Sequence, residues 1–158
     1  SNQTTITAEV MPPRGGDASQ SLEAAKILKD VVHAINVTDG SRAIMRMHSM
    51  AVCKLLIEEN IEPILQIACR DKNRIALQAE ILGAHALGIK NILCLTGDPV
   101  RAGDQPNARP VHDYESVQLL KKQSIGGYFW KITKGNALPY SSFWRMDNPI
   151  GRRDRRES

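Results

Sequence analysis

The stretch of sequence that decides the fold is PILQIACRDKNRIALQAEILGAHALGIKNILCL, residues 63–95. Its two ends, residues 63–68 and 91–95, are short apolar runs of strand length, whereas residues 74–87 carry apolar side chains at helical spacing. Gly88 then stands where helices commonly end. The order strand, helix, strand predicts two parallel strands joined by a crossover helix.

The same alternation continues on both sides of this stretch. It switches between strand-like and helix-like segments four times in residues 1–122, which predicts an α/β unit with a parallel sheet. The further elements that we expect are strands at 4–10 and 34–37, helices at 20–33 (with Ser19 as N-cap) and 42–60, and a helix that starts at Tyr114.

Residues 123–158 do not continue the alternation. Of the 21 Lys and Arg residues in the chain, nine follow Leu120, and six of the seven aromatic residues lie there too. We interpret 123–158 as a divergent, irregular basic tail, which is either disordered or read from a shifted reading frame. The basic end is typical of a solvated surface, and no nucleic-acid-binding module surrounds it, so we expect no nucleic-acid partner.

The remaining composition indicates the cellular setting. Cys53, Cys69 and Cys94 lie in apolar stretches without a C-x-x-C pair, which is typical of reduced thiols in a cytoplasmic protein. The sequence shows no signal-peptide pattern and no apolar run of the roughly 18 residues that a membrane span needs, so we expect no membrane partner. The histidines show no metal-ligand spacing, and we predict no metal site.

Polar residues follow every predicted strand, where the loops of a parallel sheet converge on one edge. Polar residues after all four strands are better explained by one shared pocket than by four independent coincidences. Glu9 is the sharpest candidate, because its place in the strand pattern predicts partial shielding from water, which favours the protonated carboxyl group of a general acid. In chain order the residues at the strand ends are Glu9, Thr38, Asp39, Arg70, Asp71, Thr96, Gly97 and Asp98.

These candidates have structural alternatives. A strand-end Glu paired with a Lys or Arg explains Glu9 equally well, and Asp98 before Pro99 is ordinary turn chemistry. The loop 97–113 is longer than most βα loops, which makes it, and His112 within it, a candidate for ligand contact. A phosphate site is one interpretation, and an ion-paired helix start the commoner one, for Arg70, Asp71 and Arg74.

Four segments closely resemble the flavin-dependent methylenetetrahydrofolate reductases. The resemblance covers residues 5–120 and implies the N-terminal half of a (β/α)₈ TIM barrel, with about four βα units present. It also implies FAD as cofactor, a folate substrate, and a reduced nicotinamide or other electron donor for the reduction of 5,10-methylenetetrahydrofolate to 5-methyltetrahydrofolate. The segments are ITAEVMPPRGGD (6–17), INVTDG (35–40), QIACRDKNRIALQAEILGAHALGIKNILCLTGDP (66–99) and VHDYESVQLL (111–120).

The resemblance also assigns roles to single residues. Glu9 matches the family's catalytic acid, which acts while the folate ring opens to an iminium, and Asp98 matches a carboxylate that tunes the flavin. Gln66 stands where some members carry a His near the flavin. The other positions that match cofactor contacts are Thr38, Leu95, Thr96, Gly97, His112 and Asp113.

Four βα units are half of what a closed barrel contains. We therefore expect unpaired edges on the first and last strands, poor stability as an isolated monomer, and a second copy or a partner subunit that completes the barrel. The alternative function is a non-catalytic truncated remnant or a half-barrel interaction subunit. A phosphate-binding aldolase or isomerase ranks last, because no Lys stands at a predicted strand end.

Overall fold

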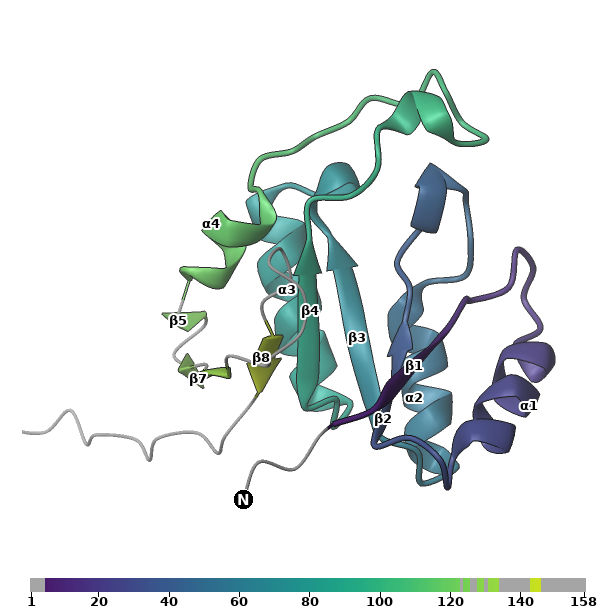
Figure 1. The fold of residues 1–158 in the computed structure, drawn as a ribbon. Coiled ribbons are helices and arrows are strands. Elements are labelled where there is room, and N and C mark those ends of the chain that lie inside the picture. The colour runs from purple at the N-terminus through teal and green to yellow at the C-terminus, as the bar shows by residue number, and fades with distance from the viewer. Residues whose placement is uncertain (1–4, 123, 126–127, 130, 134–142, 146–158) are drawn as a thin grey trace, which may run out of the picture.

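The computed structural model describes residues 5–122, 124–125, 128–129, 131–133 and 143–145. Strands and helices alternate through residue 120 in these residues, and the long loop after the fourth strand arches over the end of the sheet (Figure 1). The elements are β1 (Thr7–Val10), α1 (Ser19–Leu28), β2 (Ala34–Val37), α2 (Ser49–Glu58), β3 (Pro63–Ala68), α3 (Arg74–Ala86), β4 (Asn91–Leu95), α4 (Ser116–Leu120), β5 (Ser124–Ile125), β6 (Tyr128–Phe129), β7 (Lys131–Thr133) and β8 (Phe143–Arg145).

The sheet has the order β1-β2-β3-β4-β8-β7, with the first four strands parallel. This arrangement confirms the predicted α/β class and the four βα units of a partial barrel. Three of the strands, β2, β3 and β4, have the bounds that the sequence predicted.

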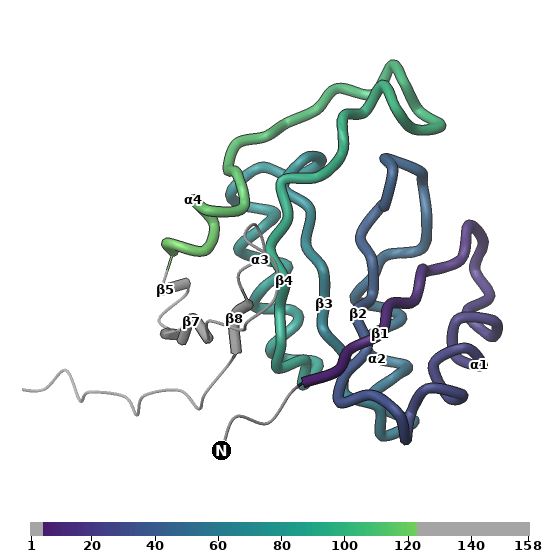
Figure 2. Tube along the Cα trace, in the orientation of Figure 1, coloured from purple at the N-terminus to yellow at the C-terminus, as the bar shows by residue number. Residues whose placement is uncertain are grey.

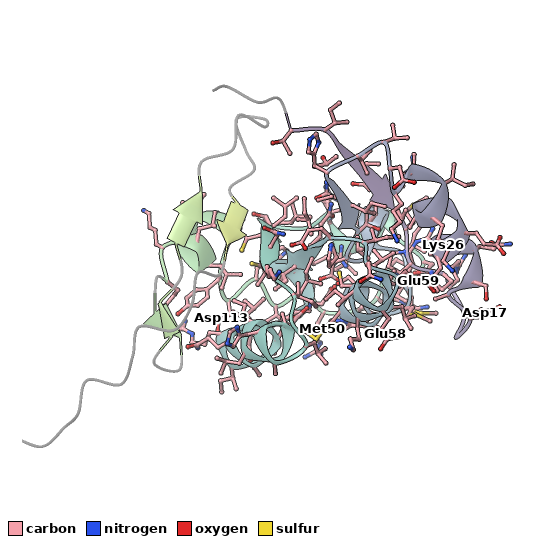
Figure 3. All side chains as sticks on the ribbon, turned by 90° about the horizontal axis from the view of Figure 1, so that it is seen from below. Asp17, Lys26, Met50, Glu58, Glu59 and Asp113 are labelled. Carbon is pink, nitrogen blue, oxygen red and sulfur yellow. The ribbon has the colours of Figure 1, made fainter. Side chains whose placement is uncertain are left out.

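The core lies between the sheet and helices α1, α2 and α3, which cover one face of it (Figures 1 and 3). Alternate strand residues, such as Ile35, Leu65 and Ile92, point into this layer and are fully buried against helix residues such as Leu56 and Ile81. On the opposite face the described residues bury a small apolar cluster, and polar side chains lie toward the carboxyl ends of the strands. The strands therefore alternate between a helix-covered face and the inward face of the partial barrel.

The second helix is shorter than predicted. The sequence pattern indicated a helix over 42–60, but α2 begins at Ser49, where the His48 imidazole accepts the backbone N–H of Met50 as an N-cap. Before it, Arg42 and Ala43 have positive φ angles of 58° and 55°, which a right-handed helix excludes. Residues 42–48, despite their helix-like apolar spacing, therefore belong to the loop before α2, which contains a 3₁₀ turn at Ser41–Ala43.

Helices α1 and α4 also start differently from the prediction. The N-cap of α1 is Ala18, and Ser19 is the first helical residue, whose N–H is accepted by the Asp17 carboxylate. Helix α4 begins two residues after Tyr114, with a capping box formed by Glu115 and Gln118. The start of α4 is set by this side-chain cap, which apolar spacing does not reveal.

The last strand of the parallel set is not a free edge, so that expectation is wrong for β4. Residues Phe143–Arg145 form β8, which pairs antiparallel with β4 and is in turn paired with β7. The irregular structure expected for 123–158 is wrong at these strands, and the rest of that segment lies outside the described residues. Strand β1 does form an edge of the sheet, as expected.

Within the described ranges, no helix combines the length and the apolar character that crossing a membrane requires.

Candidate functional site

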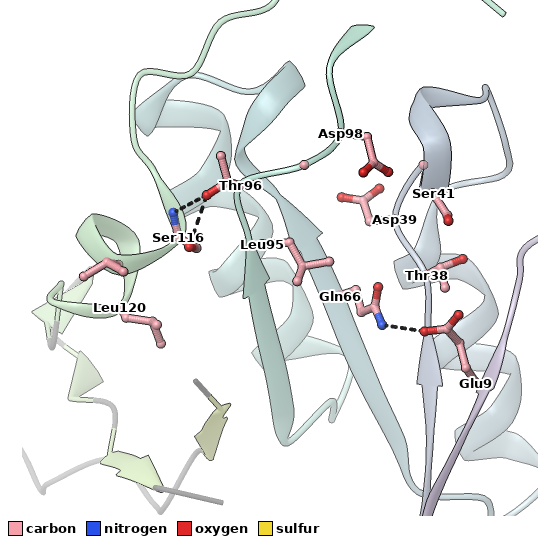
Figure 4. Close-up of a pocket in the computed structure, with 13 residues that line it drawn as sticks. Glu9, Thr38, Asp39, Ser41, Gln66, Leu95, Thr96, Asp98, Ser116 and Leu120 are labelled. Atoms are coloured by element: carbon pink, nitrogen blue, oxygen red, sulfur yellow. Dashed lines mark hydrogen bonds between the residues drawn. The ribbon is translucent and has the colours of Figure 1, made fainter. Parts of the chain in front are cut away.

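A cavity of about 480 Å³ lies at the carboxyl ends of the parallel strands (Figure 4). Polar side chains from β1, β3 and the segment after β2 form one wall of it, and Leu95 with residues of α4 forms the other. The cavity is lined by Glu9, Thr38, Asp39, Gly40, Ser41, Gln66, Leu95, Thr96, Gly97, Asp98, Ser116, Val117 and Leu120. The predicted strand-end residues at β1, β2 and β4 therefore share one pocket, whereas Arg70 and Asp71 after β3 do not line it.

Glu9 and Gln66 contact each other within this cavity. The Gln66 side-chain amide donates a hydrogen bond to Glu9 Oε2 at 3.3 Å (Figure 4), and the Gln66 backbone oxygen accepts the hydroxyl of the buried Ser49. Gln66 is buried, but Glu9 is exposed. The expected shielding of Glu9 is thus wrong for the described chain, because β1 is an edge strand and water reaches the carboxylate from its open side.

Asp98 lies above Asp39 at the mouth of the cavity (Figure 4). Its Oδ2 accepts the backbone N–H of Arg42 at 2.7 Å, and the left-handed conformation of Arg42 and Ala43 directs that N–H toward it. Backbone strain of this kind is common where a structure must aim a group at a site. The adjacent Gly97 has a φ of +95°, which glycine adopts without steric cost.

Thr38 brings an unsatisfied polar atom to the cavity. The residue is 2% exposed, and its hydroxyl oxygen has no hydrogen-bond partner among the described residues. A buried hydroxyl without a partner costs free energy unless something else pairs with it. Thr38 therefore has free hydrogen-bonding capacity at the wall of the cavity, next to the Glu9 and Gln66 pair.

Asp39 is a cavity residue that the sequence placed at a strand end without assigning it a role. Its Oδ2 accepts the Ala68 N–H at 2.8 Å and the Lys72 ammonium at 2.6 Å, and Lys72 also pairs with Glu80. Burial alone would lower the pKa of Lys72, but the charges of Asp39 and Glu80 outweigh burial and raise it. Burial raises the pKa of Glu80, against the opposing charge of Lys72.

Three loops at the rim are bound to one another. Asp104, in the long loop after β4, accepts hydrogen bonds from the Arg14 guanidinium at 2.6 Å and from the Met45 backbone N–H at 2.9 Å. Those partners belong to the loops after β1 and β2, and the three loops meet above the sheet (Figure 2). Ser116 at the start of α4 bonds to Thr96, which closes the other side of the rim.

The phosphate interpretation of the arginines does not hold, because their donors are taken by protein acceptors. Arg70 makes a bidentate pair with Asp71 at 2.6 and 2.8 Å. Arg74 makes a similar pair with Asp113, again at 2.6 and 2.8 Å, outside the cavity. The commoner interpretation, an ion-paired helix start, is confirmed.

A sequence model of the methylenetetrahydrofolate reductase family matches residues 1–133. The chain belongs to this family. No curated protein matches the sequence. Methylenetetrahydrofolate reductases have a TIM-barrel fold, and the four parallel strands with their helices are part of such a barrel. Membership supports a methylenetetrahydrofolate reductase-like, oxidoreductase function in one-carbon metabolism, and the match extends beyond the residues 5–120 that carried the resemblance.

The residues that the resemblance to methylenetetrahydrofolate reductases assigned fall into two groups. His112 and Asp113 do not line the cavity: Asp113 lies beside α3 (Figure 3), paired with Arg74, and His112 has a φ of 42° in the loop. Their contact with FAD stays a prediction. The other group lines one cavity and consists of Glu9, Thr38, Gln66, Leu95, Thr96, Gly97 and Asp98.

Several cavity residues were missed by sequence reasoning. Ser116, Val117 and Leu120 come from α4, whose side toward the cavity is set by its docking on β4. The apolar residues of VQLL (117–120) indicated a packed helix, but they did not indicate which of its residues line the pocket. Among the described residues no group of His, Cys, Asp and Glu is arranged to hold a metal ion.

Proposed function

We propose that this chain binds FAD at the carboxyl edge of its sheet and contributes to the reduction of 5,10-methylenetetrahydrofolate to 5-methyltetrahydrofolate. The observation that carries the proposal is the convergence of Glu9, Thr38, Gln66 and Asp98 on one cavity in a member of the methylenetetrahydrofolate reductase family. The family is generally flavin-dependent.

The cavity has features that fit a flavin ring. Its volume of about 480 Å³ lies within the range of about 300–1,000 Å³ typical of small-molecule sites. Leu95, Val117 and Leu120 offer an apolar wall for a flat aromatic ring, while the unpaired Thr38 hydroxyl offers a hydrogen bond to a polar ring edge. Gly97 lines the cavity and has no side chain of its own, which lets a ligand approach its backbone closely.

FAD, when bound, would supply hydride transfer to the substrate. The role of Asp98 follows from its charge. Its carboxylate is held at the cavity mouth by the Arg42 N–H, and by Coulomb's law a fixed negative charge disfavours a further anion there and favours a cationic form of the substrate. The neutral Gln66 amide, in contrast, orients Glu9 without adding charge.

Glu9 is the candidate general acid. A ligand that fills the cavity removes water from around this carboxyl group, and desolvation favours its protonated form. The protonated group can then donate its proton to a substrate nitrogen as the folate ring opens to an iminium. The hydrogen bond from Gln66 fixes which oxygen, Oε2, stays an acceptor and leaves Oε1 to carry the proton.

The partners follow from the same proposal. They are a folate substrate and a reduced nicotinamide or another electron donor, together with a second copy or a partner subunit that completes the barrel. Cys53, Cys69 and Cys94 are free and buried, which supports a reducing compartment such as the cytoplasm.

Titration of the purified protein with FAD, followed by flavin absorbance and fluorescence, tests the proposal with Thr38→Val as the variant. Valine keeps the shape but removes the hydroxyl, so we expect the free protein to gain about 1 kcal/mol of stability while FAD binds about 2- to 10-fold more weakly. Thr7→Val, on the exposed part of β1 outside the cavity, is the matched control. Absence of FAD binding by the wild type, or equal effects of both variants on FAD affinity, would contradict the proposal.

One observation favours the alternative function, a non-catalytic half-barrel. Strand β8 pairs antiparallel with β4, at the edge where a (β/α)₈ barrel adds its next strand in the parallel direction. A half-barrel with this edge occupied suits an interaction subunit or a remnant without turnover. A colourless protein that gains no flavin bands with added FAD would support the alternative.

A further inference from the structure

Arg70 is a buried charged side chain just outside the cavity. It is 5% exposed and does not line the pocket, yet it follows β3 directly, in the 3₁₀ turn Cys69–Asp71. Its neighbour Asp71 is exposed and neutralises the guanidinium through two parallel hydrogen bonds. This pairing makes burial of the charge tolerable and fixes the plane of the guanidinium group.

Two glycines of the cavity lining enclose the Arg70 side chain. A Cβ atom on Gly40 would lie 2.8 Å from Arg70 Nη2, and a Cβ atom on Gly97 would lie 2.8 Å from Arg70 Cβ. Both glycines have positive φ angles and line the cavity, one in the loop after β2 and the other in the loop after β4. The arginine thus fills a slot between two rim loops that only glycine leaves open.

The guanidinium also bonds to both loops. Arg70 Nη1 donates to the Gly40 carbonyl at 3.3 Å and to the Asp98 carbonyl at 3.4 Å. The backbone carbonyl of Arg70 accepts the N–H of Val111 at 2.8 Å, which ties down the returning end of the long loop. One residue therefore holds the loop after β2 and both ends of the loop after β4.

We propose that Arg70 is a positioning residue, which sets the spacing between the loops carrying Gly40 and Asp98 and thereby the width of the cavity mouth. The inference rests on the proposed function only for what the cavity binds. A planar, delocalised guanidinium can bond to a carboxylate on one side and to two carbonyls on another, whereas a Lys ammonium has no such fork. The residue acts on Asp98 through its backbone and does not touch the ligand.

Amide hydrogen exchange resolved by NMR tests this on the free protein, with Arg70→Gln compared with Arg74→Gln. The informative amides are those of Arg42, bonded to the Asp98 carboxylate, and Ala43, bonded to the Gly40 carbonyl. In Arg70→Gln we expect both to exchange about tenfold faster or more, since loss of a hydrogen bond to a charged group has at least that effect. Amides within β3 and β4 should be unaffected.

The control, Arg74→Gln, breaks a similar bidentate pair that lies away from the cavity, so exchange at Arg42 and Ala43 should match the wild type. Arg70→Lys should give an intermediate increase. If Arg70→Gln fails to fold, Asp71→Asn keeps the arginine and removes its exposed partner, and a smaller increase at the same two amides is expected. Unchanged exchange at both amides, or an equal increase throughout the sheet, would overturn the inference.

FAD titration of the same variants separates this inference from the proposed function. If the wild type binds FAD, Arg70→Gln should bind it more weakly, and equal affinity in Arg70→Gln would overturn the inference. If the wild type does not bind FAD, the proposed function fails, and the exchange measurements decide on Arg70 alone.

Discussion

Gly97→Ala is expected to destabilise the protein for two reasons, a positive φ angle and close packing. It should therefore cost more than an alanine at a glycine where a positive φ is the only obstacle. The φ of Gly97 is +95°, and an alanine held at positive φ costs about 1–2 kcal/mol. In addition, the new Cβ would lie 2.8 Å from Arg70 Cβ and 3.4 Å from Ala68 Cβ. Arg70 cannot move away without breaking its pair with Asp71, so overpacking adds about 1–3 kcal/mol.

Gly88→Ala is the matched control for this prediction. Gly88 follows α3 with a φ of +83°, but a Cβ there would meet nothing within 4 Å, so only the backbone cost of about 1–2 kcal/mol applies. Gly15→Ala has neither a positive φ nor a neighbour within 4 Å and should be stabilising by about 0.4–1 kcal/mol.

Urea unfolding of the three variants, followed by circular dichroism, gives the free energies to compare. The expected order of stability is Gly15→Ala, wild type, Gly88→Ala and then Gly97→Ala. FAD affinity should fall in Gly97→Ala and stay unchanged in Gly88→Ala, because only Gly97 lines the cavity. A loss of stability in Gly97→Ala no greater than in Gly88→Ala would refute the proposed close packing of Gly97 on Arg70.

Glu9→Gln should leave FAD affinity unchanged and reduce folate reduction by about 10²- to 10⁴-fold, the usual contribution of a general acid, and an active variant in a coupled assay would exclude Glu9 from that role. The three cysteines should not react with a thiol reagent at neutral pH until denaturant is added, because burial raises their pKa values, that of Cys69 to about 11; fast labelling of the native protein would contradict their burial. Hydrogen bonds from Arg74 lower the pKa of Asp113 from 3.8 to about 2, so its contribution to stability is present above pH 3.8 and lost as the pH falls through about 2. Asp113→Asn should therefore reduce the acid dependence of the urea midpoint over that window, and parallel curves for variant and wild type would argue against the pair.

The sequence was sufficient to predict those strands whose bounds are determined by neighbouring residues in the chain. The bounds of β2, β3 and β4 follow from apolar runs between polar turns, and the common edge of the strand-end residues follows from parallel order. The start of α2 could not be predicted, because the left-handed conformation of Arg42 and Ala43 depends on Asp98, which is 56 residues away in the chain.

Features that depend on long-range contacts were beyond the sequence pattern. Exposure of Glu9 depends on what lies beyond β1, and the strand alternation shows only which face the side chain is on. Asp39 was visible as a strand-end residue, but its pairing with Lys72 and Glu80 requires the positions of β3 and α3. The pairing of β8 with β4 joins residues 50 to 54 positions apart in the chain and needs the three-dimensional fold.

The antiparallel strand β8 makes β1 and β4, the two outer strands of the parallel set, unequal for assembly. Another chain that paired with β4 would first have to displace β8 and break its hydrogen bonds, whereas β1 has no second neighbour among the described strands. A strand that extends the parallel set therefore adds more readily at β1, beside Glu9, on the side from which water now reaches that carboxylate. A strand that paired with β1 would then also remove water from the Glu9 carboxylate.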